Sequence, residues 1–171
     1  MRLKTYIVDS EVLLEQAISL IARLDDDVFC ALTPMSPRGS IGGHLRHVVN
    51  FYQSFLNGYQ EGQVDYNNRE RDARFERDRL YALRCIEEVS RRLKGLAGVN
   101  ANEHLLVSVE DDSAWSRSSV LRELDFLKSH TIHHYSLVAM LLRLHEIEPG
   151  EEFGVAPATL KHWKQESLCA Q

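Results

Sequence analysis

The stretch SHTIHHY at residues 129–135 lies inside a long amphipathic run that predicts a helix from about residue 119 to residue 146. Residues four apart on a helix project from the same face, so His130 and His134 point in one direction. His133 points about 60° away from His130 by the same geometry. Two imidazoles one turn apart can reach the same metal ion. Because two ligands bind a transition metal weakly, a stable site needs a third ligand from elsewhere in the chain.

The third ligand is expected from a helix over residues 40–57, which Ser40 caps and Gly58 ends. His44 and His47 lie one turn apart near its start, and His47 is the candidate that joins His130 and His134. Three neutral imidazoles with one open position are the usual arrangement of a reactive divalent-metal site. The ligand types suit zinc, nickel or iron and do not choose among these metals.

The remaining five histidines are not expected to bind the metal directly. His44 and His133 are assigned to supporting or surface roles, and three further histidines to the surface or to packing: His104, His145 and His162. The alternative for the whole cluster is a set of partly buried histidines that are hydrogen-bonded and chemically inert.

The rest of the chain predicts an all-α protein, a four-helix bundle with a short C-terminal helix in a single domain over residues 1–171. The first helix is expected from Ser10 to Asp25, capped by Asp9 or Ser10. The third is expected over residues 68–96, with the charged residues 69–79 as its solvated face. The short helix follows Pro157. Residues 103–109 alternate in polarity, which predicts a minor extended segment or a small hairpin.

Composition narrows the classes of partner and compartment. The chain has 171 residues, of which 44% are hydrophobic and 26% charged, and its net charge is −5. No long Lys/Arg run is present, which argues against nucleic acid or an anionic membrane as partner. There is neither an apolar run long enough for a bilayer nor a signal-peptide core. Cys30, Cys85 and Cys169 are distant in sequence and are expected to be free thiols, so a cytoplasmic protein is predicted.

The motif IGGHLRHVVN at 41–50, together with SHTIHHY at 129–135, resembles the DinB-like superfamily. The stretch FGVAPATL at 153–160 resembles the tail of one bacterial branch of that superfamily, which is similar to the YfiT and mycothiol-dependent enzymes. The resemblance implies a four-helix bundle in which one histidine of the second helix and two of the fourth bind a metal. In this chain they are His47, His130 and His134. The superfamily often has Asp where this chain has Asn50, so the role of Asn50 is left open.

The functional expectation is a metal-dependent enzyme of the kind the resemblance implies, a small-thiol-dependent S-transferase acting on a small electrophile. The cofactors are then a divalent transition metal and a low-molecular-weight thiol. A metal-dependent hydrolase remains open, but no general base for water is evident, since Glu123 is expected to be a first-turn helix charge. A non-catalytic metal-binding or self-associating bundle also remains open. No catalytic residue is assigned, and a homodimer is compatible with the sequence.

Overall fold

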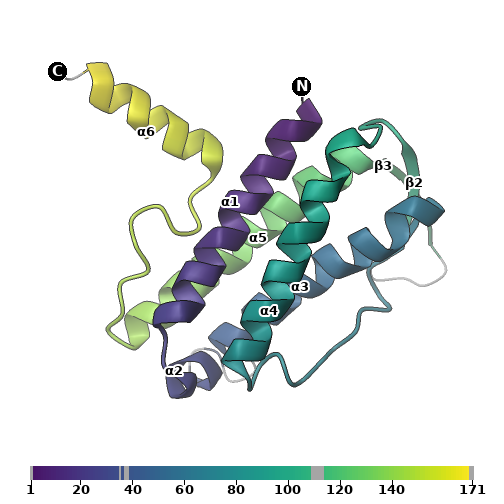
Figure 1. The fold of residues 1–171 in the computed structure, drawn as a ribbon. Coiled ribbons are helices and arrows are strands. Elements are labelled where there is room, and N and C mark those ends of the chain that lie inside the picture. The colour runs from purple at the N-terminus through teal and green to yellow at the C-terminus, as the bar shows by residue number, and fades with distance from the viewer. Residues whose placement is uncertain (1, 35, 37–38, 109–113, 170–171) are drawn as a thin grey trace.

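The computed structural model describes residues 2–34, 36, 39–108 and 114–169, with side chains described as far as residue 166. Four long helices pack side by side, and helices α1 and α3 each contact both α4 and α5 (Figure 1). A shorter helix, α2, follows α1. Another, α6, is the last element of the chain and projects away from the packed helices in Figure 1. The helices are α1 (Arg2–Arg23), α2 (Asp26–Cys30), α3 (Ile41–Gly58), α4 (Arg79–Lys94), α5 (Val120–Leu144) and α6 (Pro157–Cys169), with 3₁₀ turns at Tyr59–Glu61 and Gly95–Gly98.

The prediction of an all-α four-helix bundle is wrong, because the chain also forms a three-stranded mixed sheet. Strand β2 (His104–Ser108) is the expected extended segment, and its last predicted residue, Val109, lies outside the described residues. It pairs in parallel with β1 (Gln63–Asp65) and antiparallel with β3 (Ser116–Ser119). Sequence inspection missed both partners because each is very short and β3 is wholly polar, so neither shows an apolar alternation.

Gly58, the last residue of α3, explains how β1 can follow the helix so closely. A Cβ atom at position 58 would lie 2.0 Å from the carbonyl oxygen of Gln63, the first residue of β1. Only glycine permits this approach of two backbone segments. The glycine that ends the helix therefore also positions the sheet.

The third predicted helix is much shorter than expected. Residues 68–78 are not helical, residues 73–77 form a turn, and α4 begins at Arg79. The Asp72 carboxylate accepts a hydrogen bond from the Arg74 amide, and the Asp78 carboxylate accepts one from the Tyr81 amide. Aspartate side chains that satisfy nearby backbone donors favour turns and helix starts over helix interiors. Residues 69–78 are therefore not the solvated helix face predicted from their charges.

The N-terminal region also differs from the prediction. Helix α1 already begins at Arg2, and Ser10, the expected cap, is fully buried within it. The helix ends at Arg23, and a separate helix α2 has Asp26 and Asp27 in its first turn, where the helix dipole favours negative charge. The other predicted helix starts are confirmed: Ser40 accepts a hydrogen bond from the Gly43 amide at 3.0 Å, Ser119 accepts one from the Arg122 amide at 3.3 Å, and the C-terminal helix starts at Pro157.

The core fixes α3 and α5, the two helices that carry the histidine motifs. Tyr52 of α3 and Thr131 of α5 are fully buried, and the Thr131 hydroxyl donates to the Tyr52 oxygen at 3.3 Å. One turn after Thr131, the Tyr135 hydroxyl donates to the Leu13 carbonyl of α1 at 2.7 Å. These buried contacts set the rotation of α5 about its axis, and with it the direction of the histidines.

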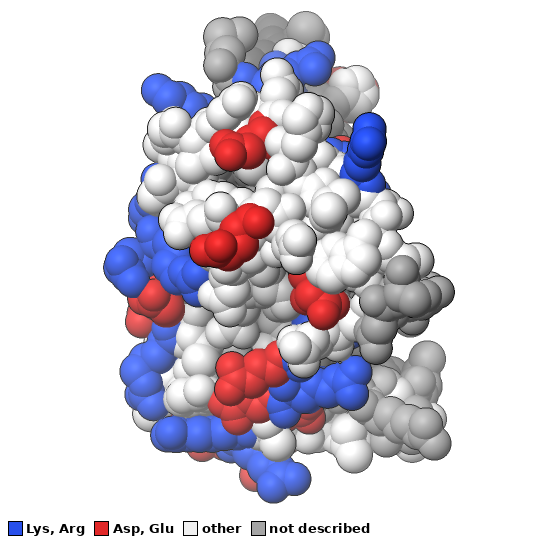
Figure 2. Space-filling model, turned by 90° about the vertical axis from the view of Figure 1, so that its right-hand side faces the viewer, with Lys and Arg blue, Asp and Glu red and all other residues white. Residues whose placement is uncertain are grey.

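The surface carries charges of both signs. Figure 2 shows basic side chains mainly at the left and lower margins of one face, with acidic side chains scattered between them. Within the described residues, no helix combines the length and the apolar content that crossing a bilayer requires. Cys30 and Cys85 are free thiols as predicted, whereas the side chain of Cys169 lies outside the described part of the chain.

Candidate metal centre

His47, His130 and His134 converge on one point between α3 and α5. Each offers a ring nitrogen, and the three nitrogens lie within 4.8 Å of one another. The ring centroids are separated by 4.5 Å between His47 and His134, by 4.6 Å between His130 and His134, and by 5.0 Å between His47 and His130. All three side chains are half-buried. The group predicted from the sequence is therefore one that could hold a metal ion.

The three imidazoles are neutral at physiological pH. Burial, reinforced by neighbouring charges, lowers the pKa of His47 to about 4, that of His130 to about 4 and that of His134 to about 3. Burial disfavours the charged form, and three rings this close also repel one another when protonated. A neutral imidazole keeps a lone pair on one nitrogen, which is the form that binds a metal.

The described residues fit a divalent ion. The Nε2 atom of His130 is buried and has no hydrogen-bond partner in the described structure. Buried polar atoms are nearly always satisfied, so an orphan nitrogen beside two other imidazoles indicates a missing ligand. Zinc at about 2.1 Å from three tetrahedrally arranged nitrogens would separate them by roughly 3.4 Å. Side-chain rotations that move the nitrogens by on the order of 1 Å would bring them to that separation.

His44 contacts the cluster from one side. Its Nδ1 lies 3.0 Å from Nδ1 of His134, and the two rings are tilted with centroids 5.3 Å apart. Only one of the two atoms can carry the shared proton. If the His134 nitrogen donates it, Nε2 of His134 keeps its lone pair for a metal, and His44 orients the ligand as partners of metal-bound histidines usually do. The supporting role predicted for His44 agrees with this contact.

Aromatic rings form the wall of the site on the other side. The Phe51 ring, one turn after His47, has its centroid 4.9 Å from that of His47 and 4.4 Å from that of His130. Phe126, one turn before His130, stacks on the His130 ring at 5.5 Å. Tyr66, which follows β1, stacks on Phe51 at 5.1 Å. These rings limit the access of water to the nitrogens and keep the local dielectric low.

The acidic side chain of Glu123, next to this wall, already has partners. Glu123 is 1% exposed, accepts a hydrogen bond from the Tyr66 hydroxyl at 2.8 Å and another from Ser118, and pairs with Arg122 at 3.3 Å. Burial and the Glu123 carboxylate raise the pKa of Tyr66 well above its ordinary value. Glu123 lies in the first turn of α5 as predicted, and it also links α5 to the segment after β1.

The remaining predicted residues lie outside the cluster. Asn50 is buried, and its amide donates to the Gln53 side chain at 3.1 Å, one turn along α3. His133 is exposed, and its ring meets the His134 ring edge-on with the two centroids 5.3 Å apart. Of the histidines assigned to the surface or to packing, His104 and His162 are exposed and His145 is half-buried.

Sequence inspection missed Phe51, Tyr66 and Arg69 as parts of the site. The Arg69 guanidinium carbon lies 4.3 Å from the centroid of the Phe51 ring. Arg69 was assigned to a helix face that does not form, and its neighbourhood is set by the sheet and the turns after it. No local pattern in the sequence carries this information, although an aromatic residue one turn after His47 is a signal that could have placed Phe51.

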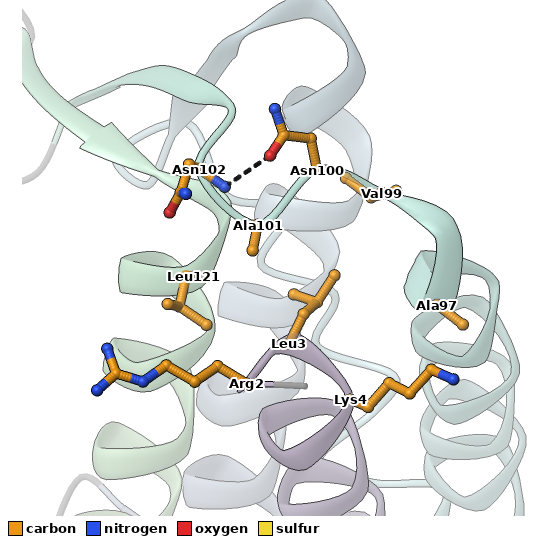
Figure 3. Close-up of a pocket in the computed structure, with 9 residues that line it drawn as sticks. All are labelled: Arg2, Leu3, Lys4, Ala97, Val99, Asn100, Ala101, Asn102 and Leu121. Atoms are coloured by element: carbon orange, nitrogen blue, oxygen red, sulfur yellow. Dashed lines mark hydrogen bonds between the residues drawn. The ribbon is translucent and has the colours of Figure 1, made fainter.

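A separate surface pocket of about 510 Å³ lies between the start of α1, the segment after α4 and the first turn of α5 (Figure 3). Leu3, Ala101 and Leu121 form its apolar part, while the charged ends of Arg2 and Lys4 diverge to either side in Figure 3. Leu121 precedes His130 by nine residues, about 13 Å of helix rise, so this pocket is distinct from the histidine cluster. It brings together no metal ligands or nucleophiles, and we assign it no function.

Comparisons with known proteins leave the family open. The chain is 31% identical over 109 residues to FK506-binding protein 5 of Rhizopus delemar, an alignment that covers 60% of this chain and 28% of that protein. The chain therefore spans under a third of the length of this curated relative. No family model matches the chain. No solved structure matches it either.

Proposed function

We propose that this protein is a metal-dependent S-transferase that joins a small thiol to a small electrophile. The observation that carries the proposal is the convergence of three neutral imidazoles, from two helices, around the orphan Nε2 of His130. The resemblance of the two histidine motifs to the DinB-like superfamily supports the same function. His47, His130 and His134 would hold the metal.

A divalent ion at this place would lower the pKa of a bound thiol and so supply a thiolate near neutral pH. The thiolate sulfur attacks the electrophilic carbon, the new C–S bond forms, and the leaving group departs with its electron pair. The thiol proton goes to solvent. His47, His130 and His134 would hold the ion, and Phe51 and Phe126 would exclude competing water from the site.

The arrangement favours thiol transfer over hydrolysis. A general base within reach of the attacking water assists many metal-dependent hydrolases. The group of converging ligand atoms in the described residues consists of histidines alone, and the nearby Glu123 is buried and hydrogen-bonded to Tyr66 and Ser118. Glu76 pairs with Arg46 at 2.9 Å. A thiol has an ordinary pKa of about 8.5, far closer to neutrality than that of water, so a metal ion deprotonates it more readily and it suits this site better.

Turnover of monochlorobimane tests the proposal, since replacement of its chloride by a thiol gives a fluorescent thioether. Tag-free protein is reconstituted separately with zinc and with nickel, and the rate is measured with and without added cysteine. We expect turnover that requires both metal and thiol and that falls at least a hundredfold in His130→Gln. His104→Gln, an exchange of an exposed histidine, is the control. Thiol-independent consumption of the electrophile would contradict the transferase and favour a hydrolase.

A further inference from the structure

We infer that the substrate bound at the histidine cluster carries an anionic group, such as a carboxylate, and that Arg69 is the residue that selects it. This inference rests on the proposed function, because it concerns the ligand that the same site receives. It assigns Arg69 a role in specificity, without a part in bond making.

Arg69 lies one aromatic ring away from two of the three candidate ligands. Its guanidinium carbon is 4.3 Å from the centre of the Phe51 ring, and that centre is 4.4 Å from the His130 ring and 4.9 Å from the His47 ring. Both distances are measured from the Phe51 ring centre, so the guanidinium carbon lies no farther from the centre of the His130 ring than their sum. The Arg69 charge also lowers the pKa of both His47 and His130, so a small molecule held at the histidines lies within range of that charge.

The Arg69 charge lacks a compensating carboxylate. In the described part of the chain, its guanidinium donates to the backbone carbonyl of Tyr66 and makes no ion pair. Asp65, the acid whose charge acts on it, already accepts hydrogen bonds from the Asn67 and Asn68 amides. Two neighbouring arginines differ, since Arg46 pairs with Glu76 and Arg122 with Glu123. Arg69 is thus a cation that remains available to a ligand, as judged from the described residues.

Arg46 adds a second, independent sign of a missing anion. It directly precedes His47, and its Nε atom is buried without a hydrogen-bond partner in the described structure, although another nitrogen of the same guanidinium pairs with Glu76. The Arg46 charge lowers the pKa of both Arg69 and His47, so the three groups share one electrostatic neighbourhood. Arg71 adds its positive charge to the same neighbourhood, and the described residues show no ion pair for Arg69.

An anionic group on the substrate removes the imbalance. A guanidinium offers several N–H donors in a planar fork that matches a carboxylate, and hydrogen bonds between charged groups are the strong ones. Burial also lowers the pKa of Arg69, which reflects the cost of holding its charge away from water. Binding an anion offsets that cost. A neutral substrate of the same size would leave the guanidinium uncompensated beside a metal cation.

Two thiols of similar size isolate this contact: mercaptoacetate, which has a carboxylate, and 2-mercaptoethanol, which has a hydroxyl instead. The protein is loaded with cobalt(II), the metal content is measured, and each thiol is titrated while the sulfur-to-cobalt charge-transfer absorption is followed. The variants are Arg69→Gln, which removes the charge, and Arg69→Lys, which keeps it without the fork. Arg143→Gln, an exposed arginine in the last turn of α5, is the matched control. Circular dichroism checks that each variant is folded.

We expect the parent and Arg143→Gln to bind mercaptoacetate at least about tenfold more tightly than 2-mercaptoethanol, as a charge-assisted hydrogen bond provides. Arg69→Gln should abolish this preference, with affinity for 2-mercaptoethanol unchanged, and Arg69→Lys should keep part of it. Normal cobalt loading with no preference in the parent, or a preference that survives in Arg69→Gln through chelation by the thiol itself, would overturn the inference and leave the metal site intact. Failure of the parent to bind cobalt would overturn the proposed function together with this inference.

Discussion

Acidification should destabilise the metal-free protein through its three clustered histidines. In an unfolded chain a histidine has a pKa of about 6.5, whereas burial and mutual repulsion lower the pKa of His47 and His130 to about 4 and that of His134 to about 3. Between about pH 4 and about pH 6.5 the unfolded chain binds more protons than the folded protein. Stability is therefore complete above about pH 6.5 and falls as the pH drops toward 4.

The size of the effect follows from the shifts. One ring with a folded pKa of about 4 loses about 2 kcal/mol of folding free energy when the pH falls from about 7 to about 5. The three rings share their mutual repulsion, and each is half-buried and so partly screened by solvent, so their losses do not add in full. We expect about 3 kcal/mol for the cluster as a whole, a large part of the stability of a domain of this size.

Urea denaturation of EDTA-treated protein, followed by circular dichroism at both pH values, measures this loss. The variant His47→Gln/His130→Gln/His134→Gln removes the titrating rings, and His104→Gln removes an exposed histidine as the control. The parent and the control should lose about 3 kcal/mol more than the triple variant on acidification. Equal losses in the parent and the triple variant would refute the electrostatic account of the cluster.

Three further changes test individual contacts. His44→Ala should weaken metal binding about ten- to a hundredfold without abolishing it, as loss of a partner that orients a ligand does, measured by competition with a chromophoric chelator. Tyr66→Phe should lower the unfolding free energy by about 1–3 kcal/mol, because the buried Glu123 loses a donor; no change in urea midpoint would argue against that hydrogen bond. Gly58→Ala should cost at least about 2 kcal/mol because its Cβ would collide with the backbone of β1, whereas Gly98→Ala, which meets open space, should be nearly neutral in the same assay.

The convergence of the three histidines could be predicted from the sequence because their geometry is largely local. The spacing of His130 and His134 decides that they share a helix face, and the apolar stripes of two helices bring His47 toward that face. The starts of α3 and α5 were also predictable, since serine caps act on the backbone a few residues away. Such short-range interactions do not depend on the rest of the fold.

The sheet and the surroundings of the site could not be predicted, because they depend on contacts between distant segments. Strand β1 pairs with β2 some forty residues later, and its three residues carry no pattern of their own. The turns around Asp72 and Asp78 likewise replace a helix that charge patterning alone favoured. The approach of Arg69 to Phe51 is a consequence of both features, so no window of sequence reveals it.

Metal content measured on tag-free protein after reconstitution tests the central claim most directly. We predict about one divalent ion per chain in the parent and in His104→Gln, and almost none in His47→Gln, because removal of the ligand from α3 leaves only the pair on α5. No bound ion in the parent, or an unchanged content in His47→Gln, would contradict the claim that the two helices build one metal site.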